Sequence, residues 1–463
     1  MVGPNASKAF GRAIGDESVR ISVIIDRLKA TVDRGTADGQ LLEPPSSTTV
    51  ADNEASISAV HAEEIFYDYF QTLLLDARPY SATEARDKIF EVFGIAQKAL
   101  PPGMAMPLKP NYTSESTTQS LFTSVAALLL EKLPRLSNLS HVEDKCSRRV
   151  PNLPSWVPDY TNRLTPIPLT FIRGLNFAFD CCPDNILPEE KHTIERGLLE
   201  LTGAFFDRVA KVCLPLWEVI KSSDIEPCMK LCLKIREPYL DLKQDAGEVL
   251  WRTMIADTHN SQPAAETMGP VFSIWARNRI AIKLTPEIRV IDETGAITSN
   301  VRLDEALLRS QLSTLRGLHD ASAGKLSLPT VDEVLMSIKQ LHRFKLQDFV
   351  SQNAILYPND PFPTGAEQIN RLEKDAAAFH FALGPTMPFR RLYLTKKGYL
   401  GLGPESMEVD DQVFMLQAAR VPFVLREKAD SSFELMGETY IHGFMEGRMV
   451  AELKVEMGPV HIS

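Results

Sequence analysis

The stretch that decides the fold class is FELMGETYIH, residues Phe433–His442, because its side chains alternate with a period of two. Phe433, Leu435 and Ile441 fall on one side of an extended chain, and Glu434 and its alternating neighbours fall on the other. A period of two is typical of a half-buried β-strand. The C-terminal part of the chain is therefore predicted to contain a β-sheet.

Further strand signals surround this stretch from Arg390 onward. Residues 413–416 and 421–425 are short apolar runs, and residues 429–432 form a polar turn before the alternating stretch. A single hairpin is only marginally stable in water, so three or four strands must pack together. We expect a small antiparallel β-sheet or barrel over residues 390–463.

Upstream of this segment the periodicity becomes helical. Thr330 and Glu333 have the spacing of a capping box ahead of an amphipathic stretch, which predicts a helix start. Residues 134–170 are rich in proline and turn formers and are expected to be loop. Apolar residues at helical spacing predict helices near 61–77, 84–99, 115–133, 301–319 and 331–350.

These signals predict an α+β protein with a mainly helical body. We expect an N-terminal helical segment over residues 1–34 and a flexible linker rich in Gly, Pro, Ser and Thr over 35–60. The helical body then covers residues 61–389, and the β-rich module covers 390–463. No repeat of 20–50 residues is evident.

Composition narrows the functional classes. The chain has 463 residues, with 50 Lys and Arg against 60 Asp and Glu, a net charge of −10. This balance argues against a general nucleic-acid or anionic-membrane binder. The longest apolar run, Val125–Leu130, is far shorter than the roughly 18 residues of a membrane span. Without an apolar leader, and with six cysteines, an intracellular, cytoplasmic protein is expected.

Several groups of residues are candidates for a metal site or a catalytic site. Cys228 and Cys232 could share a helix face, but two further ligands of suitable spacing are missing, and small buried side chains are favoured. Adjacent Cys181 and Cys182 receive the same interpretation. His442 is favoured as a packed or surface imidazole over a catalytic base, because no Ser or Cys partner is evident.

Three further groups of residues have patterns that occur in binding sites. His61 and Glu64 could hold a metal, but a polar helix start is favoured. Asp410 and Asp411 could bind a divalent cation, but solvated turn residues are favoured. Gly401-Leu-Gly403 is half a dinucleotide fingerprint and is favoured as a tight turn. We therefore expect no catalytic, cofactor-binding or metal-binding residues and no bound metal.

Residues 82–96 (ATEARDKIFEVFGIA), residues 153–160 (LPSWVPDY) and the C-terminal tail after Arg390 are three ordered segments with recognisable motifs. Together they resemble the C-terminal portion of fungal heterokaryon-incompatibility (HET) proteins. Residues 82–96, ATEARDKIFEVFGIA, contain Arg86 and Asp87 at the first turn of a predicted helix. Residues 153–160, LPSWVPDY, place Trp156 between two prolines. We expect this indole to anchor an extended loop against the helices near 84–99 and 115–133, with the nearby aspartate accepting local backbone hydrogen bonds.

The third segment is the C-terminal tail, which is similar to the family pattern "T-x-x-G-x-x-G-L-G-P … G-D-x-V … P-x-x-L-R … G-E-x-Y". It departs from the pattern at Asp410 and Ala418, where glycine is usual. Residues 199–209 fit a weaker family segment that begins with an apolar strand. The resemblance implies a structural role for Arg86, Asp87, Trp156, Pro158, Asp159, Gly403, Pro404, Arg426, Gly437 and Tyr440.

The resemblance also implies a function. The family's N-terminal HET domain carries "Y-x-W-G"-like and "C-I-N-Q" segments, which this sequence lacks, so most or all of that domain is expected to be missing. We expect a non-catalytic interaction or regulatory protein in fungal nonself recognition, with a protein partner. The alternative is an enzyme or accessory protein of fungal secondary metabolism, and a small-molecule ligand is left open.

Overall fold

The computed structural model describes most of the chain. The chain divides into two compact units, the first comprising residues 1–73 and 92–109 and the second residues 74–91 and 110–463. The described residues are 48–100, 104, 107–163, 166–173, 178–182, 192–235, 244–284, 287–291, 297–301, 305–321, 327–338, 374–447 and 456–463. The predicted segment 1–34 lies outside them.

In the first unit, aromatic side chains of two helices form the core. The ring of Phe93, on α4, meets those of Phe66 and Phe70, on α3, edge-on at centroid distances of 6.4 and 5.4 Å. Such edge-to-face pairs add to the stabilisation from burial. The two helices are α3 (Thr48–Asp76) and α4 (Asp87–Ala96), the latter followed by a short 3₁₀ turn, η1 (Gln97–Ala99).

The start of α3 corrects one prediction. Residues 48–60 are helical, although they belong to the segment 35–60 that was expected to be a flexible linker. Ala51, Ala55 and Ala59 recur along this stretch, and alanine is the strongest helix former, so local propensity outweighs the Ser and Thr content. Residues 35–47 lie outside the described residues.

The second unit contains a barrel of five strands. Strand β2 pairs with β13 and β9, β13 pairs with β11, and β10 joins β11 to β9, which closes the circle. All of these pairings are antiparallel except β11–β13. The strands are β2 (Leu198–Pro215), β9 (Gln412–Leu416), β10 (Phe423–Glu427), β11 (Phe433–Glu438) and β13 (Gly458–Ile462). The α+β class is thus confirmed, with a mixed barrel.

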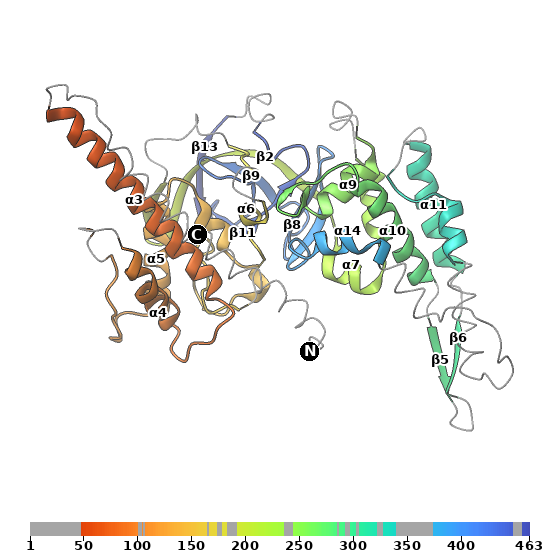
Figure 1. Ribbon diagram of the computed structural model, residues 1–463, viewed down its shortest axis with the longest axis horizontal. Helices are drawn as coiled ribbons and strands as arrows, with labels where there is room; N and C mark the ends of the chain where they lie inside the picture. The colour runs from red at the N-terminus through yellow and green to blue at the C-terminus, as the bar shows by residue number, and fades with distance from the viewer. Residues whose placement is uncertain are drawn as a thin grey trace, which may run out of the picture. The chain divides into compact units, whose positions relative to one another are not determined.

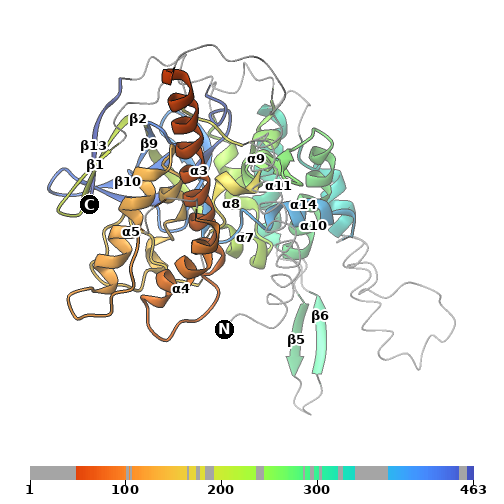
Figure 2. The same ribbon diagram turned by 60° about the vertical axis from the view of Figure 1, so that its left-hand side comes forward.

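The central strand of this barrel comes from far upstream. The 18-residue β2 pairs through its first half with the barrel strands and through residues 209–215 with β7. Figure 1 and Figure 2 both show β2 side by side with the blue C-terminal strands β9 and β13. The flanking strands are β1 (His192–Glu195), which pairs with β2, and β7 (Arg390–Thr395), β8 (Leu400–Pro404) and β12 (Tyr440–Ile441), which extend the sheet.

Helices form much of the described remainder of the second unit. Aromatic side chains fix part of their packing. The ring centroids of Phe272 and Trp275, on α10 (Met268–Leu284), lie 4.9 and 5.1 Å from that of Phe379, on α14 (Ala377–Leu383). The Thr330–Glu333 capping box is present, with Glu333 N donating to Thr330 Oγ1 and Thr330 N donating to Glu333 Oε2. It opens a helix over residues 331–338, and the remainder of the predicted 331–350 helix lies outside the described residues.

The remaining elements have the following bounds. The helices are α5 (Thr118–Lys132), α6 (Leu169–Ile172), α7 (Leu216–Ser222), α8 (Glu226–Cys232), α9 (Ala246–Met254), α10 (Met268–Leu284), α11 (Glu305–Ala321) and α14 (Ala377–Leu383), with 3₁₀ turns η2 (Ser137–His141) and η3 (Lys145–Ser147). Two hairpins pair β3 (Thr258–His259) with β4 (Gln262–Pro263) and β5 (Glu287–Ile291) with β6 (Ile297–Val301). No described helix is both long and apolar enough to cross a membrane.

Candidate functional site

The loop around Trp156 is the most densely connected part of the predicted motif set. Trp156 is fully buried, and its Nε1 donates a 2.9 Å hydrogen bond to the carbonyl of Gly197, just before β2. Pro158 and Tyr160 are buried as well, and the Tyr160 ring meets Phe122 of α5 edge-on at 5.1 Å. A buried loop without strand or helix pairing must satisfy its backbone groups in another way.

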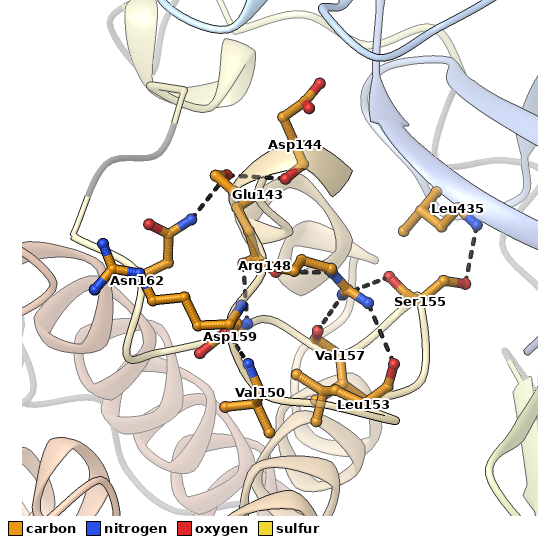
Figure 3. Close-up of polar contacts among 12 residues, drawn as sticks. Glu143, Asp144, Arg148, Val150, Leu153, Ser155, Val157, Asp159, Asn162 and Leu435 are labelled. Carbon is orange, nitrogen blue, oxygen red and sulfur yellow. Dashed lines mark hydrogen bonds and ion pairs between the residues drawn. The ribbon is translucent and has the colours of Figure 1, made fainter.

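Arg148 supplies most of the donors that this loop needs. Its Nη1 donates to the carbonyls of Leu153 and Pro154, at 3.3 and 3.2 Å. Its Nη2 donates to those of Ser155 and Val157, at 2.9 and 2.6 Å. Figure 3 shows the guanidinium lying among these carbonyl groups. One planar side chain therefore replaces the ladder of hydrogen bonds that a strand would provide.

Glu143 holds Arg148 in this position. Its carboxylate accepts from Arg148 Nε at 2.9 Å, from Arg78 Nη1 at 3.2 Å and from the backbone N–H of Asp159 at 2.9 Å. The side chain of Glu143 is fully buried, and that of Arg78 is 1% exposed. A buried carboxylate is tolerated only when it is paired and hydrogen-bonded, and here all three contacts come from the chain itself.

Asp159 closes the other side of the loop (Figure 3). Its Oδ2 accepts from the backbone N–H groups of Arg149 and Val150, at 2.7 and 2.8 Å, and its Oδ1 accepts from Thr161. Burial by itself raises the pKa of Asp159, but these hydrogen bonds outweigh it and hold the pKa below its ordinary value. The carboxylate is thus kept charged and accepts local backbone hydrogen bonds, as the sequence predicted for this aspartate.

Side-chain contacts tie this loop to the barrel strands and to the segment between β8 and β9. Ser155 Oγ donates to the carbonyl of Ser463 and accepts from the N–H of Leu435 on β11, at 2.6 and 2.9 Å. Asp144 Oδ2 accepts from the N–H of Ser406, and Lys145 pairs with Glu434, both at 2.8 Å. We call residues 143–163, with these contacts, the tryptophan loop. It joins segments that lie about 300 positions apart in the sequence.

Arg86 and Asp87 fix the position of a second loop, which contains residues 112–116. Arg86 donates to the carbonyls of Thr113 and Ser116, at 3.1 and 2.8 Å, and its guanidinium lies 5.3 Å from the Tyr112 ring. Asp87 accepts from the Tyr112 hydroxyl at 2.6 Å. Both side chains therefore position the loop that leads to α5, within the second unit.

The barrel residues of the motif also meet one another. Arg426 binds both oxygens of Asp411, at 2.7 and 2.9 Å, and donates to the carbonyl of Ser406. Asp411 is buried, so the expectation of a solvated turn residue is wrong for it: the bidentate partner makes burial of the charge tolerable. Asp410 is exposed and pairs with Lys396 at 2.6 Å.

Glycines of the motif stand where a side chain would not fit. Gly401 and Gly403 lie inside β8 rather than in a tight turn, which corrects that expectation. A Cβ at Gly401 would overlap the ring of Tyr393 on the neighbouring strand. Gly437 has φ +139° and lies against Pro404, at a bulge in β11 where one step along β10 corresponds to two along β11. The physical reason is close ring and backbone approach within the sheet.

Sequence reasoning also missed the buried ion pair of Arg390 with Glu438. Arg390 Nη2 donates to Glu438 Oε1 at 2.7 Å, and both side chains are at most 4% exposed. Glu438 also accepts from the N–H of Leu169, and Arg390 donates to the carbonyl of Ile167, so the pair fixes the start of α6. The only signal was a glutamate within the alternating strand, whose partner lies 48 residues upstream.

The other candidates are buried or displaced. Cys181, Cys182, Cys228 and Cys232 are all at most 3% exposed, as small core side chains would be. Tyr440 OH lies 2.9 Å from Nδ1 of His442, a buried imidazole whose pKa is lowered to about 3 by burial. His61 and Glu64 do not open a helix, because α3 begins at Thr48. Within the described ranges, no three His, Cys, Asp or Glu residues are placed to hold a metal ion.

These features define a class of protein. It is a helical protein with a mixed barrel, and its buried charged side chains bind backbone groups of its own loops. Residues 366–456 match the family model of the Het-6 beta-barrel domain, which includes β9, β10 and β11 of the barrel. Strands β2 and β13 lie outside that match.

The chain is also a distant relative of "Heterokaryon incompatibility protein 6, OR allele" of Neurospora crassa. The two are 21% identical over 410 residues, which covers 81% of this chain and 50% of the relative. The chain thus spans about half the length of the curated relative that it matches. No solved structure matches it. The relation to HET proteins that the motifs suggested is supported at this level.

Proposed function

We propose that this protein acts in fungal nonself recognition as an interaction or regulatory protein in the cytoplasm, without catalysing a reaction. The relation to heterokaryon incompatibility protein 6 supports a role in this process. The observation that supports a non-catalytic role is the tryptophan loop, where Glu143, Arg148 and Asp159 bind groups of the chain itself. Groups used in this way hold a scaffold and are not directed toward a substrate.

The proposed partner is another protein, which would contact exposed aromatic side chains of the second unit. Phe381 on α14 is 76% exposed, and Trp217 on α7 is 41% exposed. Aromatic side chains are enriched at protein–protein interfaces because they bury much apolar area with few rotatable bonds. Substitution of these two residues removes contact area without touching the tryptophan loop.

The test is a heterokaryon viability assay. The full chain is expressed in one of two compatible strains of a filamentous fungus, and viable heterokaryons are counted. We expect expression to change viability, Phe381→Ser with Trp217→Ser to weaken that change, and Arg149→Met, at an exposed side chain outside these positions, to preserve it. Melting curves of all variants establish that they are folded.

Two outcomes contradict the proposal. One is unchanged viability with folded, expressed protein in every strain pair. The other is turnover of a small molecule that a single polar substitution abolishes while the melting curve stays the same. The alternative of a role in secondary metabolism stays a prediction from the sequence.

A further inference from the structure

Three cysteines meet where β2 approaches α8. Cys213 lies near the end of β2, and Cys228 and Cys232 lie one turn apart on α8. The sulfur atoms of Cys213 and Cys228 are 3.5 Å apart, which is direct contact between two thiols. All three residues are free cysteines and are at most 5% exposed.

The backbone around Cys213 is irregular. On β2, Val212 pairs with Tyr393 and Pro215 pairs with Arg391, so three steps along β2 correspond to two along β7. Cys213 lies within this bulge. Residues of a bulge are released from the regular ladder and re-aim a side chain, so the Cys213 sulfur can shift by the short distance that separates contact from a covalent bond.

The two thiols are chemically unequal. The hydrogen bond from Cys228 lowers the pKa of Cys213, against the effect of burial, and the same contact together with burial raises the pKa of Cys228. Burial raises the pKa of Cys232 as well. Because the thiolate is the nucleophile, this difference favours Cys213 as the sulfur that reacts first, and the 3.5 Å contact places Cys228 where it can react with it.

We propose that Cys213 and Cys228 form a redox modification site, a dithiol that hydrogen peroxide converts reversibly to a disulfide linking β2 to α8. The Cys213 thiolate attacks one peroxide oxygen, the O–O bond breaks, and water leaves after protonation, which gives a sulfenic acid at Cys213. The Cys228 sulfur then attacks the Cys213 sulfur, a second water leaves, and the S–S bond forms. Two thiols lose two electrons, and peroxide is reduced to two waters.

The disulfide would connect the barrel to the helical part of the same unit. Glu226, on the first turn of α8, accepts hydrogen bonds from Ser310 and Thr314 of α11, at 2.5 and 3.2 Å. A covalent bond at Cys228 therefore fixes a helix that is already joined to α11. Closing this short chain segment restricts the unfolded chain, so the oxidised protein melts at a higher temperature.

The experiment maps thiols in the full chain. Purified protein is treated with hydrogen peroxide, denatured in an alkylating reagent, digested and examined by mass spectrometry. We expect a cross-linked peptide pair joining Cys213 to Cys228, which dithiothreitol releases, and a melting temperature a few degrees higher for the oxidised protein. Cys213→Ser and Cys228→Ser abolish both effects, whereas Cys146→Ser, at an exposed thiol, preserves them.

Two results overturn the proposal. One is full alkylation of Cys213 and Cys228 under treatment that oxidises Cys146. The other is a bond from Cys213 to Cys232 or to another cysteine in place of Cys228. Mapping of the unmodified sequence decides both, so the test stands even where a serine variant fails to fold.

Discussion

The tryptophan loop and the barrel bury their backbones by different means. In the barrel, strand β2 and its neighbours pair N–H and C=O groups in ladders, so side chains are free to form the apolar interior. In the tryptophan loop, prolines prevent such pairing, and the side chains of Arg148, Glu143 and Asp159 bind the backbone instead. Charged residues are therefore structural in the loop and would be costly in the barrel interior.

This difference predicts where single substitutions lower the stability of the protein most. A ladder contains many equivalent hydrogen bonds, so the loss of one side chain leaves most of them intact. The tryptophan loop depends on few groups, each with several contacts, so removing one leaves several buried polar atoms without partners. We expect the largest effects of substitution in the loop and the smallest in the turns of the barrel.

The largest expected effect is that of Trp156→Ala. The indole is fully buried, and its removal leaves a large cavity and an unpaired carbonyl at Gly197. We expect the free energy of unfolding to fall by about 3–5 kcal/mol, measured by thermal and urea denaturation. Trp156→Phe, which keeps most of the volume, is the matched control and should cost much less. An unchanged melting curve for the alanine variant would falsify the assigned role of the loop.

Arg148→Met should have the next largest effect and lower the free energy of unfolding by about 3 kcal/mol. It removes one partner of the buried Glu143 carboxylate and the donors of four backbone carbonyls. The neighbouring Arg149 is the natural control: its side chain is exposed, and only its backbone N–H takes part in the network. Urea denaturation of Arg148→Met and Arg149→Met compares the two. Equal midpoints would show that the guanidinium contacts contribute nothing.

The sequence indicated the elements with strong local patterns. The strand predicted at 433–442, the capping box at Thr330 and the helices near 84–99 and 115–133 are all present, because each depends on neighbouring residues. The alternation did not indicate burial correctly, because residues 435–442 are buried on both faces of the chain. The position of β2 between β9 and β13 in the barrel was not predictable, because these pairings join residues more than 200 positions apart. Periodicity indicates a strand but not its partner.

The same limit applies to the site. The motif residues Trp156 and Asp159 were singled out, but Arg148 and Glu143, which hold them, carry no signal beyond their charge. A charged residue in a proline-rich segment reads as solvated unless its partners are known. Buried ion pairs such as Arg390–Glu438 are invisible for this reason.

The stability of the folded chain should depend on pH through two buried histidines, one near each region. His141 in η2 and His442 after β12 are both buried, which lowers the pKa of each to about 3. The unfolded chain takes up these protons below about pH 6.5, whereas the folded chain does so only near the lowered pKa. Stability is therefore present above pH 6.5 and falls as the pH decreases, by up to about 1.4 kcal/mol per pH unit for each histidine.

His442→Gln should reduce this slope by the contribution of one histidine. Urea denaturation at about pH 7 and about pH 5 gives the slope directly, and it separates the pH effect from any constant loss of stability. The unsubstituted chain, measured at the same two pH values, provides the reference slope. A slope that His442→Gln leaves unchanged would mean that this imidazole is not buried and neutral.

The smallest expected effect tests a barrel turn. Asp410 stands where the HET pattern has glycine, and its φ is +72°. Reciprocal backbone hydrogen bonds clamp this turn to β2: Asp410 N donates to the carbonyl of Val209, and Val209 N donates to that of Asp411, both at 2.9 Å. The left-handed conformation therefore cannot relax without loss of both bonds.

Comparison of Asp410→Gly with Asp410→Ala isolates this strain, because both variants lose the same exposed ion pair with Lys396. Only alanine carries a Cβ into the left-handed region, so the glycine variant should be the more stable by about 1 kcal/mol in urea denaturation. Equal stability would mean that the clamp to β2 is weaker than its geometry indicates. In that case the ladder at this edge of the barrel would yield locally, and the contrast with the tryptophan loop would be smaller than proposed.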